Sequence, residues 1–211
     1  MSDPRRTRHV MGEPRRGKPS WLKIRPRAGE EYHELRRLFA DRRLNTICAE
    51  ARCPNTAECW SRRTATFLIL GDRCTRRCTF CNVGYGWSGE VDADEPRRLA
   101  EGLARLGLRH AVLTSVDRDD LDDGGAAVFT ECVERIRRLD PGIRIEVLVP
   151  DFRGKEGALR RVLDSGPDVL AHNLETVPRL YPGVRPRSSY EHSLEVLRQA
   201  DAHSPRPVVC L

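Results

Sequence analysis

Three cysteines with CxxxCxxC spacing carry the strongest chemical signal in the sequence: Cys74, Cys78 and Cys81. They follow an apolar run over residues 66–70 that predicts a buried strand ending at Gly71. A short loop with this spacing can place three thiolates around one face of an iron–sulfur cluster. Three protein ligands leave one iron of a four-iron cluster open to a substrate or cosubstrate, as catalytic metal sites require.

Two other uses of these cysteines compete with a cluster. Structural zinc sites normally use CxxC pairs, and the three residues between Cys74 and Cys78 fit that pattern poorly. A disulfide beside a spare thiol requires an oxidising compartment, for which the sequence gives no sign. The arginines at positions 73, 76 and 77 favour the cluster, because nearby positive charge stabilises thiolate over thiol.

Three further cysteines lie upstream with CxxxxCxxxxxC spacing: Cys48, Cys53 and Cys59. Such crowding over residues 48–81 indicates metal binding rather than a disulfide framework. Two triplets separated by a strand are not expected to share one metal, so the upstream set predicts a second cluster with a fourth ligand from elsewhere. Its alternative is a set of buried, inert thiols, which the polar neighbours disfavour. Cys132 is expected in the core of a helix face and Cys210 in the interior of a strand.

The composition describes one globular domain of 211 residues, of which 39% are hydrophobic and 32% charged. No apolar run reaches the roughly 18 residues of a membrane span, and the start lacks the apolar core of a secretory signal, so a cytoplasmic location is predicted.

Much of the net charge of +6 lies early in the chain. We interpret it as a disordered basic tail rather than a nucleic-acid-binding surface.

Strand and helix patterns alternate after the CxxxCxxC loop. Strands are predicted at residues 111–116, 143–149, 169–171 and 207–211, with helices near residues 30–43, 99–106, 124–139, 159–166 and 190–200. Repeated βα units build a parallel sheet, and continuous apolar strands indicate that both of its faces are covered. We therefore predict an α/β fold, a partial TIM-type (β/α) barrel, with an open doubly wound sheet as the alternative.

Polar residues follow each predicted strand at its C-terminal end, which is the catalytic face of such a barrel. Asn173 and Glu175 are expected to bind the amino group and ribose hydroxyls of a zwitterionic nucleoside, and His172 is expected to be structural. The acidic run over residues 117–123 is interpreted mainly as loop and helix capping, with Arg118 facing the site.

From about residue 18 onward the sequence resembles the lipoyl synthase family of radical S-adenosylmethionine (SAM) enzymes. The matching stretches include KPSWLK at 18–23, LNTICAEARCPN at 44–55, ECW at 58–60, TATF at 64–67 running on to position 81, TSVDRDDL at 114–121, DGGA at 123–126, EVLVPDF at 146–152 and HNLETV at 172–177. The paired cysteine triplets are highly specific to this family among radical enzymes. The aromatic Phe80 before the last cysteine also fits the radical SAM signature.

This resemblance implies two [4Fe–4S] clusters and SAM as cofactors. Cys74, Cys78 and Cys81 would hold the cluster that binds and cleaves SAM, with Phe80, Asn173 and Glu175 at the cosubstrate. Cys48, Cys53 and Cys59 would hold an auxiliary cluster that supplies sulfur. A deoxyadenosyl radical would abstract hydrogen at C6 and C8 of a protein-bound octanoyl chain, and sulfur would be inserted at each position to form the lipoyl cofactor.

The implied partners are octanoylated lipoyl carrier domains, namely ketoacid dehydrogenase E2 subunits and the glycine cleavage H protein, and an electron donor such as ferredoxin or flavodoxin. Acidic carriers would suit a basic enzyme surface. Neither nucleic acid nor a membrane is expected as a partner.

Two alternative functions remain. The first is a zinc-stabilised nucleic-acid-binding module, which the βα pattern disfavours. The second is a biotin synthase-like enzyme, which the upstream triplet disfavours.

Three segments are predicted: a disordered basic tail at 1–17, an extension with the auxiliary cysteines at 18–62, and a partial barrel at 63–211. The family's glycine-rich segment after strand five, last strand and C-terminal tail are absent, so we expect an incomplete enzyme, with an unpaired sheet edge, that cannot make lipoyl product. The family's tail carries an Arg-Ser-Ser-Tyr whose serine ligates the auxiliary cluster. The same tetrapeptide at 187–190 is predicted to cap a helix instead, through a capping box of Ser188 and Glu191.

Overall fold

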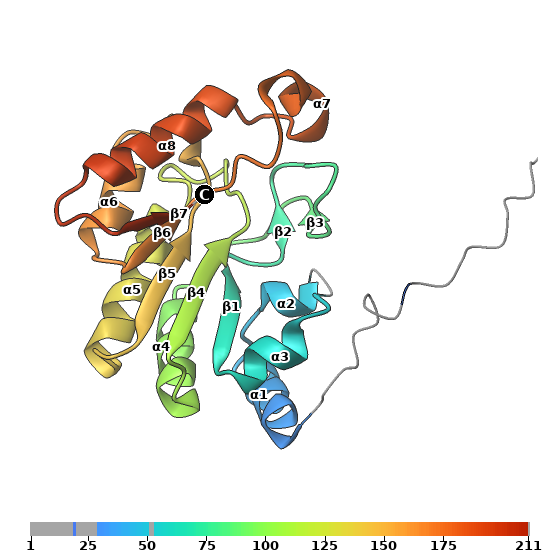
Figure 1. Cartoon of the computed structure of the whole chain (residues 1–211), viewed down its shortest axis with the longest axis vertical. Helices are drawn as coiled ribbons and strands as arrows, with labels where there is room; N and C mark the ends of the chain where they lie inside the picture. The colour runs from blue at the N-terminus through green and yellow to red at the C-terminus, as the bar shows by residue number, and fades with distance from the viewer. Residues whose placement is uncertain (1–18, 20–28, 51–52, 211) are drawn as a thin grey trace, which may run out of the picture.

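The computed structural model describes residues 19, 29–50 and 53–210, so the predicted basic tail at 1–17 lies outside the described part. Its core is one parallel sheet whose spatial order, β1-β4-β5-β6-β7, repeats the order in the chain (Figure 1). The strands are β1 (Thr64–Ile69), β4 (His110–Ser115), β5 (Arg144–Leu148), β6 (Val169–Ala171) and β7 (Val208–Cys210). Parallel strands in sequential order form the wall of a TIM-type barrel, and the predicted fold class is confirmed.

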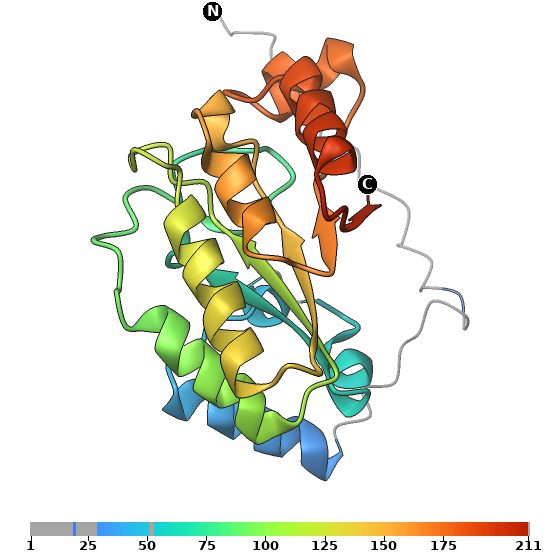
Figure 2. The ribbon, with the colours of Figure 1, turned by 90° about the vertical axis from the view of Figure 1, so that its left-hand side faces the viewer.

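Four helices alternate with these strands: α4 (Glu95–Leu106), α5 (Ala126–Leu139), α6 (Ala158–Asp164) and α8 (Tyr190–Ala202). All four lie on the same face of the sheet (Figure 2), whereas a doubly wound sheet would place its crossover helices on both faces. Helix α4 buries the predicted stripe of Leu99, Leu103 and Leu106 and ends at Gly107, whose φ of 54° is left-handed. The other face of the sheet is thereby left for the functional site.

Three short helices precede the sheet and pack beside its first strand: α1 (Glu30–Asp41), α2 (Ile47–Glu50) and α3 (Thr56–Ser61). Phe39 of α1 contacts both Trp60 of α3 and Phe67 of β1 edge-to-face, with ring centroids 5.0 and 5.4 Å apart. The backbone N–H of Leu68 donates to the carbonyl of Asn45 at 2.9 Å. The described part of the predicted extension therefore shares one hydrophobic core with the sheet.

Small elements shape the loops above the sheet: β2 (Arg73–Cys74), β3 (Gly84–Tyr85), the 3-10 helices η2 (Phe152–Gly154) and η3 (Pro178–Leu180), and α7 (Tyr181–Val184). Strands β2 and β3 pair in parallel and frame the cysteine loop. None of the described helices is long and apolar enough to cross a membrane.

The two cysteines outside the triplets differ in their surroundings. Cys132 is fully buried on α5, as predicted. Cys210 is exposed, so the prediction of an interior strand position is wrong. Side chains alternate along a strand, and the half-buried Val209 is the residue of β7 that packs against the core, which leaves Val208 and Cys210 pointing to the other side.

Candidate active site

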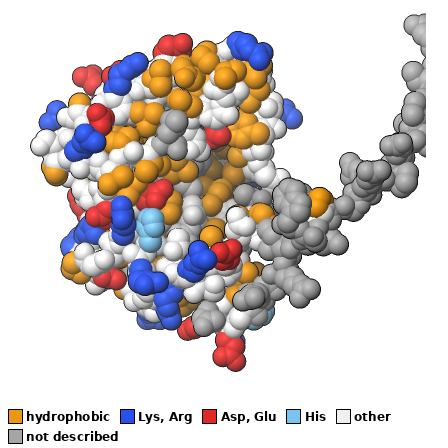
Figure 3. Space-filling view, in the orientation of Figure 1, with side chains coloured by type: hydrophobic (Ala, Val, Ile, Leu, Met, Phe, Trp, Pro, Cys, Tyr) orange, Lys and Arg blue, Asp and Glu red, His pale blue; other side chains and the backbone are white. Residues whose placement is uncertain are grey.

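A cavity of about 660 Å³ opens at the C-terminal ends of the sheet strands. The space-filling view shows this face hollowed near its centre, with hydrophobic side chains along much of the hollow (Figure 3). The lining residues come from α2, β1, the cysteine loop, β4, β5, the loop after β6 and the residue that follows α7. Sequence-distant loops therefore meet at one place, as expected for the catalytic face of a barrel.

Six of the predicted site residues line this cavity: Cys74, Cys78, Phe80, Cys81, Asn173 and Glu175. The upstream triplet of Cys48, Cys53 and Cys59 does not line it. Those three cysteines nevertheless lie near one another, because the Cys53 N–H donates to the Cys48 carbonyl at 3.0 Å and the charges of both act on Cys59. Ile47, next to Cys48 in the chain, lines the cavity.

The surroundings of two thiols of the cysteine loop, those of Cys74 and Cys78, favour their neutral form. Burial raises the pKa of Cys74 to about 12, and the carboxylate of Asp117, 3.7 Å from the sulfur, adds to the effect. Burial first and Asp117 second also raise the pKa of Cys78. Burial and the charge of Asp117 therefore outweigh the expected effect of the arginines at both residues, although the charges of Arg185 and Arg76 act to lower the pKa of Cys78.

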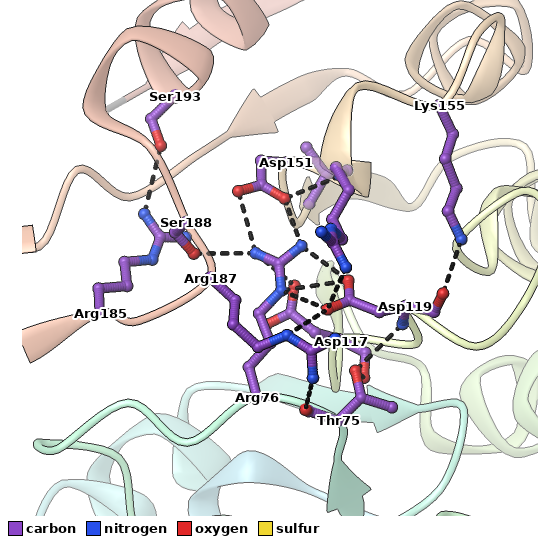
Figure 4. A network of polar contacts seen from close by, with 12 residues as sticks. Thr75, Arg76, Asp117, Asp119, Asp151, Lys155, Arg185, Arg187, Ser188 and Ser193 are labelled. Atoms are coloured by element: carbon purple, nitrogen blue, oxygen red, sulfur yellow. Dashed lines mark hydrogen bonds and ion pairs between the residues drawn. The ribbon is translucent and has the colours of Figure 1, made fainter. Parts of the chain in front are cut away.

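Arg76 is the centre of a buried polar network (Figure 4). Its guanidinium donates two hydrogen bonds to Asp151, at 2.6 and 3.0 Å, and three to Asp119, at 2.8 to 3.2 Å. It also donates to the Ser188 hydroxyl at 2.9 Å and lies 3.3 Å from a carboxylate oxygen of Asp117. The network joins the cysteine loop to the loops after β4 and β5 and to the segment before α8.

The charges in this network are strongly coupled. Although burial disfavours its charged form, the hydrogen bonds to Asp119 and Asp151 raise the pKa of Arg76 further above its usual range. Burial alone would raise the pKa of Asp151, but the Arg76 hydrogen bonds hold it below its ordinary value. For Asp117 burial outweighs the attraction of Arg76, and the pKa is raised.

The loop after β6 brings an amide and a carboxylate to the cavity. The Asn173 amide donates to Glu175 at 2.9 Å, and both side chains are exposed. Glu175 has a φ of 63°, a left-handed conformation that is uncommon for a residue other than glycine. The preceding His172 is buried with Nδ1 2.8 Å from the Val149 carbonyl, and burial lowers its pKa, which fits the predicted structural role.

The family model of the radical SAM superfamily matches residues 68–210, which include the whole sheet from the end of β1 onward. This chain belongs to the radical SAM superfamily. A solved structure of methylornithine synthase has a TM-score of 0.52 over 84% of this chain and 53% of its own, at 18% identity, and shows the likeness of fold alone.

Curated lipoyl synthases are similar to this radical SAM chain throughout most of its length. The enzyme of Rubrobacter xylanophilus is 53% identical over 90% of this chain, that of Chloroflexus aggregans 52% over 96%, and that of Caldicellulosiruptor saccharolyticus 54% over 87%. The chain spans 60%, 65% and 64% of the length of these three relatives.

Membership of the radical SAM superfamily implies an iron–sulfur cluster and SAM, and the residues around the cavity fit them. Three sulfur donors on one loop are the soft ligands that iron–sulfur clusters use. Iron deprotonates a coordinating thiol outright, so cluster binding would release the protons that Cys74 and Cys78 otherwise retain.

Arg118 does not face the cavity, contrary to the prediction. It is buried, pairs with Asp120 at 2.8 Å, and donates to the carbonyls of Leu70 and Gly89 at 3.3 and 2.8 Å. The N–H of Leu70, which has a φ of 69°, donates to the buried carboxylate of Glu95 at 2.9 Å. Arg118 and Glu95 together hold the left-handed turn that leads from β1 into the cysteine loop.

The acidic residues after β4 have two roles: some cap helix α5, and others belong to the Arg76 network. Asp123 accepts hydrogen bonds from the N–H groups of Gly125 and Ala127 at 2.8 and 2.7 Å, which confirms capping of α5. Asp117 and Asp119 instead turn toward Arg76. Sequence reasoning named Arg76 only as a charge beside the thiols and missed its carboxylate network, although an arginine inside the cysteine loop and carboxylates after two strands were visible signals.

The helix cap before α8 lies one residue later than predicted. Ser189 is the N-cap: its hydroxyl accepts from the His192 N–H at 3.2 Å and bonds to Glu191 at 2.8 Å. Ser188 bonds to Arg76 instead, so the proposed capping box of Ser188 and Glu191 is wrong.

Proposed function

We propose that this chain is part of a lipoyl synthase, an enzyme that inserts two sulfur atoms by radical chemistry at C6 and C8 of an octanoyl chain attached to a carrier protein. The observation that carries the proposal is the pair of separate cysteine triplets, one lining the cavity and one on the neighbouring α2–α3 segment. The identity of 52% to 54% with curated lipoyl synthases supports the same assignment.

The two triplets would have different roles. Cys74, Cys78 and Cys81 would hold a [4Fe–4S] cluster with one iron free of protein ligands, and Cys48, Cys53 and Cys59 would hold an auxiliary [4Fe–4S] cluster. When bound, the first cluster supplies the electron that cleaves SAM and the second supplies sulfur. Asn82 joins the two regions, because its side-chain amide donates to the Glu50 carbonyl of α2 at 2.8 Å.

The remaining cavity residues would position the reactants. Phe80, Asn173 and Glu175 offer a ring face, an amide and a carboxylate to the nucleoside. Ile47, Leu68 and Leu148 supply apolar surface that excludes water from the reacting carbon atoms of the octanoyl chain. The chain's contribution is therefore binding, orientation and shielding of the cofactors.

The proposed partners are octanoylated lipoyl carrier domains and a small electron donor such as ferredoxin or flavodoxin. An acidic carrier would be attracted by a chain with a net charge of +6. This attraction predicts that binding of the carrier weakens as salt rises, because exposed charges are screened.

The test is anaerobic reconstitution of the chain with iron and sulfide. About eight irons per chain are expected for two four-iron clusters. The reconstituted chain is then supplied with octanoylated carrier, SAM and reductant, and the carrier is followed by mass spectrometry for the lipoyl product. Cys210→Ala, which removes an exposed cysteine outside both triplets, should retain the iron and the cleavage of SAM. Colourless protein with stoichiometric zinc, or iron-loaded protein that does not cleave SAM, would refute the proposal. Multiple turnovers to lipoyl product would overturn the expectation that this chain is an incomplete enzyme.

A further inference from the structure

Two exposed arginines outside the cavity, Arg153 and Arg187, are held next to the same buried carboxylate. Nη1 of Arg153 and Nε of Arg187 each lie 3.9 Å from Oδ2 of Asp119. Their side chains are 46% and 51% exposed, and neither is among the described residues that line the cavity. In the same part of the chain, no other carboxylate lies within ion-pair distance of either arginine.

The charge of Asp119 does not require these two arginines, because Arg76 already compensates it. Arg76 donates three hydrogen bonds to the carboxylate at 2.8 to 3.2 Å, whereas the two exposed arginines lie beyond hydrogen-bond distance of it. Exposed ion pairs contribute little to stability. Lys155 adds a further cation, since its ammonium donates to the backbone carbonyl of Asp119 at 3.0 Å. This surface therefore carries an excess of positive charge.

The backbone at both arginines adopts an uncommon conformation. The φ angle is 52° at Arg153 and 71° at Arg187, in the left-handed region that residues other than glycine rarely occupy. Such a conformation persists only where the surrounding structure imposes it. The Arg153 N–H donates to Asp151 at 2.9 Å, and Nη1 of Arg187 donates to the Thr75 carbonyl at 3.3 Å. The fold therefore sets where the two cations lie.

The arginine pair adjoins the cysteine loop. The contact from Arg187 reaches Thr75, which directly follows Cys74 in the chain (Figure 4). The Thr75 hydroxyl also accepts from the Asp119 N–H at 3.1 Å. A protein bound to this pair would thus lie close to the proposed cluster and would leave the cavity free for its ligands.

We infer that Arg153 and Arg187 dock the electron donor, a small one-electron donor protein with an acidic surface. The inference rests on the proposed function, in which each cleavage of SAM consumes one electron from outside. The donor transfers that electron to the cluster of the cysteine loop and leaves in its one-electron-oxidised form. Carboxylates of the donor would accept charge-assisted hydrogen bonds from the two guanidiniums, and the opposite charges would speed the encounter.

The octanoylated carrier is the other proposed acidic partner. Its modified side chain must enter the cavity, so the carrier has to cover the opening of the cavity. The electron must arrive while the cavity is occupied, which requires a second surface near the cysteine loop. A cationic pair outside the cavity lining therefore fits the electron donor better than the carrier.

The experiment measures binding of flavodoxin to the anaerobically reconstituted full chain by isothermal titration calorimetry. Combined Arg153→Gln and Arg187→Gln substitution should raise the dissociation constant by about 3- to 30-fold, as the loss of two exposed charge contacts implies, and should weaken its salt dependence. The matched control combines Arg109→Gln and Arg144→Gln. It removes the same charge from exposed residues at the N-terminal ends of β4 and β5 and should leave the affinity unchanged.

The rate of cluster reduction gives a second readout. Reduced flavodoxin at subsaturating concentration should reduce the double variant more slowly than wild type, by the same factor as the loss of affinity. Dithionite is a small reductant that needs no docking surface, so its rate should not change. The affinity for octanoylated carrier should also be unchanged.

Flavodoxin affinity that is absent in wild type, unchanged in the Arg153 and Arg187 variant, or lowered equally in the control overturns the inference. Equal slowing with both reductants overturns it, and so does a loss of carrier affinity as large as the loss of flavodoxin affinity. If the double variant does not fold, Arg187→Gln alone carries the test, with an expected loss of about 2- to 5-fold, and an undiminished affinity overturns the inference.

The inference and the proposed function can fail separately. An iron-loaded chain that binds flavodoxin through this pair but does not cleave SAM would refute only the proposed function. Cleavage of SAM with unchanged flavodoxin affinity in the variant would refute only the inference.

Discussion

Substitution of Arg76 by glutamine is expected to lower the free energy of unfolding by about 3–5 kcal/mol, the usual cost of leaving buried charges without their partner. The side chains of Asp151 and Asp119 are only 1% and 8% exposed, so water cannot replace the guanidinium. For a chain of this size the loss corresponds to a decrease of roughly 6–20 °C in melting temperature.

The effect of this substitution should depend on pH. In wild type the pKa of Asp151 is held low, so its contribution is present above the unfolded pKa of about 3.9 and is lost as pH falls through the folded value. Without Arg76, burial dominates and raises the folded pKa. The variant then binds more protons when folded than when unfolded, and its stability falls as pH rises above about 4. The difference between the two proteins should therefore widen from pH 4 to pH 8.

Urea unfolding of the cluster-free chain, followed by circular dichroism across this pH range, measures the difference directly. Arg77→Gln is the matched control: this exposed neighbour lies over the Tyr85 ring at 5.9 Å and should change stability by no more than about 0.5 kcal/mol. A stability loss in Arg76→Gln that is the same at pH 5 and pH 8, or no larger than that of Arg77→Gln, would refute the reasoning.

Three further predictions concern the loops. Cys78→Ala and Cys53→Ala should each reduce the iron to about four per chain, and only Cys78→Ala should abolish SAM cleavage; equal loss of iron from both sites in either variant would contradict the division into two triplets. Gly71→Ala should cost about 1–3 kcal/mol in thermal unfolding, because φ is 95° and the new Cβ would lie 2.2 Å from the Ser88 hydroxyl; wild-type stability would show that the turn relaxes freely. Ser189→Ala should cost about 1 kcal/mol through loss of the α8 cap, and an unchanged melting temperature would argue against that cap.

The elements that the sequence predicted well are those specified by local pattern. Two patterns are each followed by the glycine that ends them: the apolar run at 66–70 and the leucine stripe that stops at Gly107. The structure forms a strand, β1, and a helix, α4, at these two places. The C-terminal ends of parallel strands lie on one edge, so Asn173 and Glu175 could be placed at the cavity together with the CxxxCxxC loop.

Long-range pairing and side-chain direction could not be predicted in the same way. Arg76 lies between two cysteines in the chain, but its guanidinium bonds to Asp151, 75 positions away. Ser188 and Ser189 are both plausible caps by residue type, and the choice between them depends on where Arg76 lies. Arg118 follows a strand as site residues do, yet it turns away from the cavity toward the backbone of Leu70.

The hydrogen bonds between the cysteine loop and segments later in the chain also affect the order of events during protein synthesis. The ribosome adds Ser188 112 positions after Arg76, which takes about 6 to 22 s at about 5–20 residues per second. During that interval the cysteine loop is being completed and emerges from the ribosome, while the segment before α8 has not yet been made. The loop therefore acquires its full set of anchors only late in translation, and iron delivered earlier would meet an open, mobile chain rather than the finished cavity.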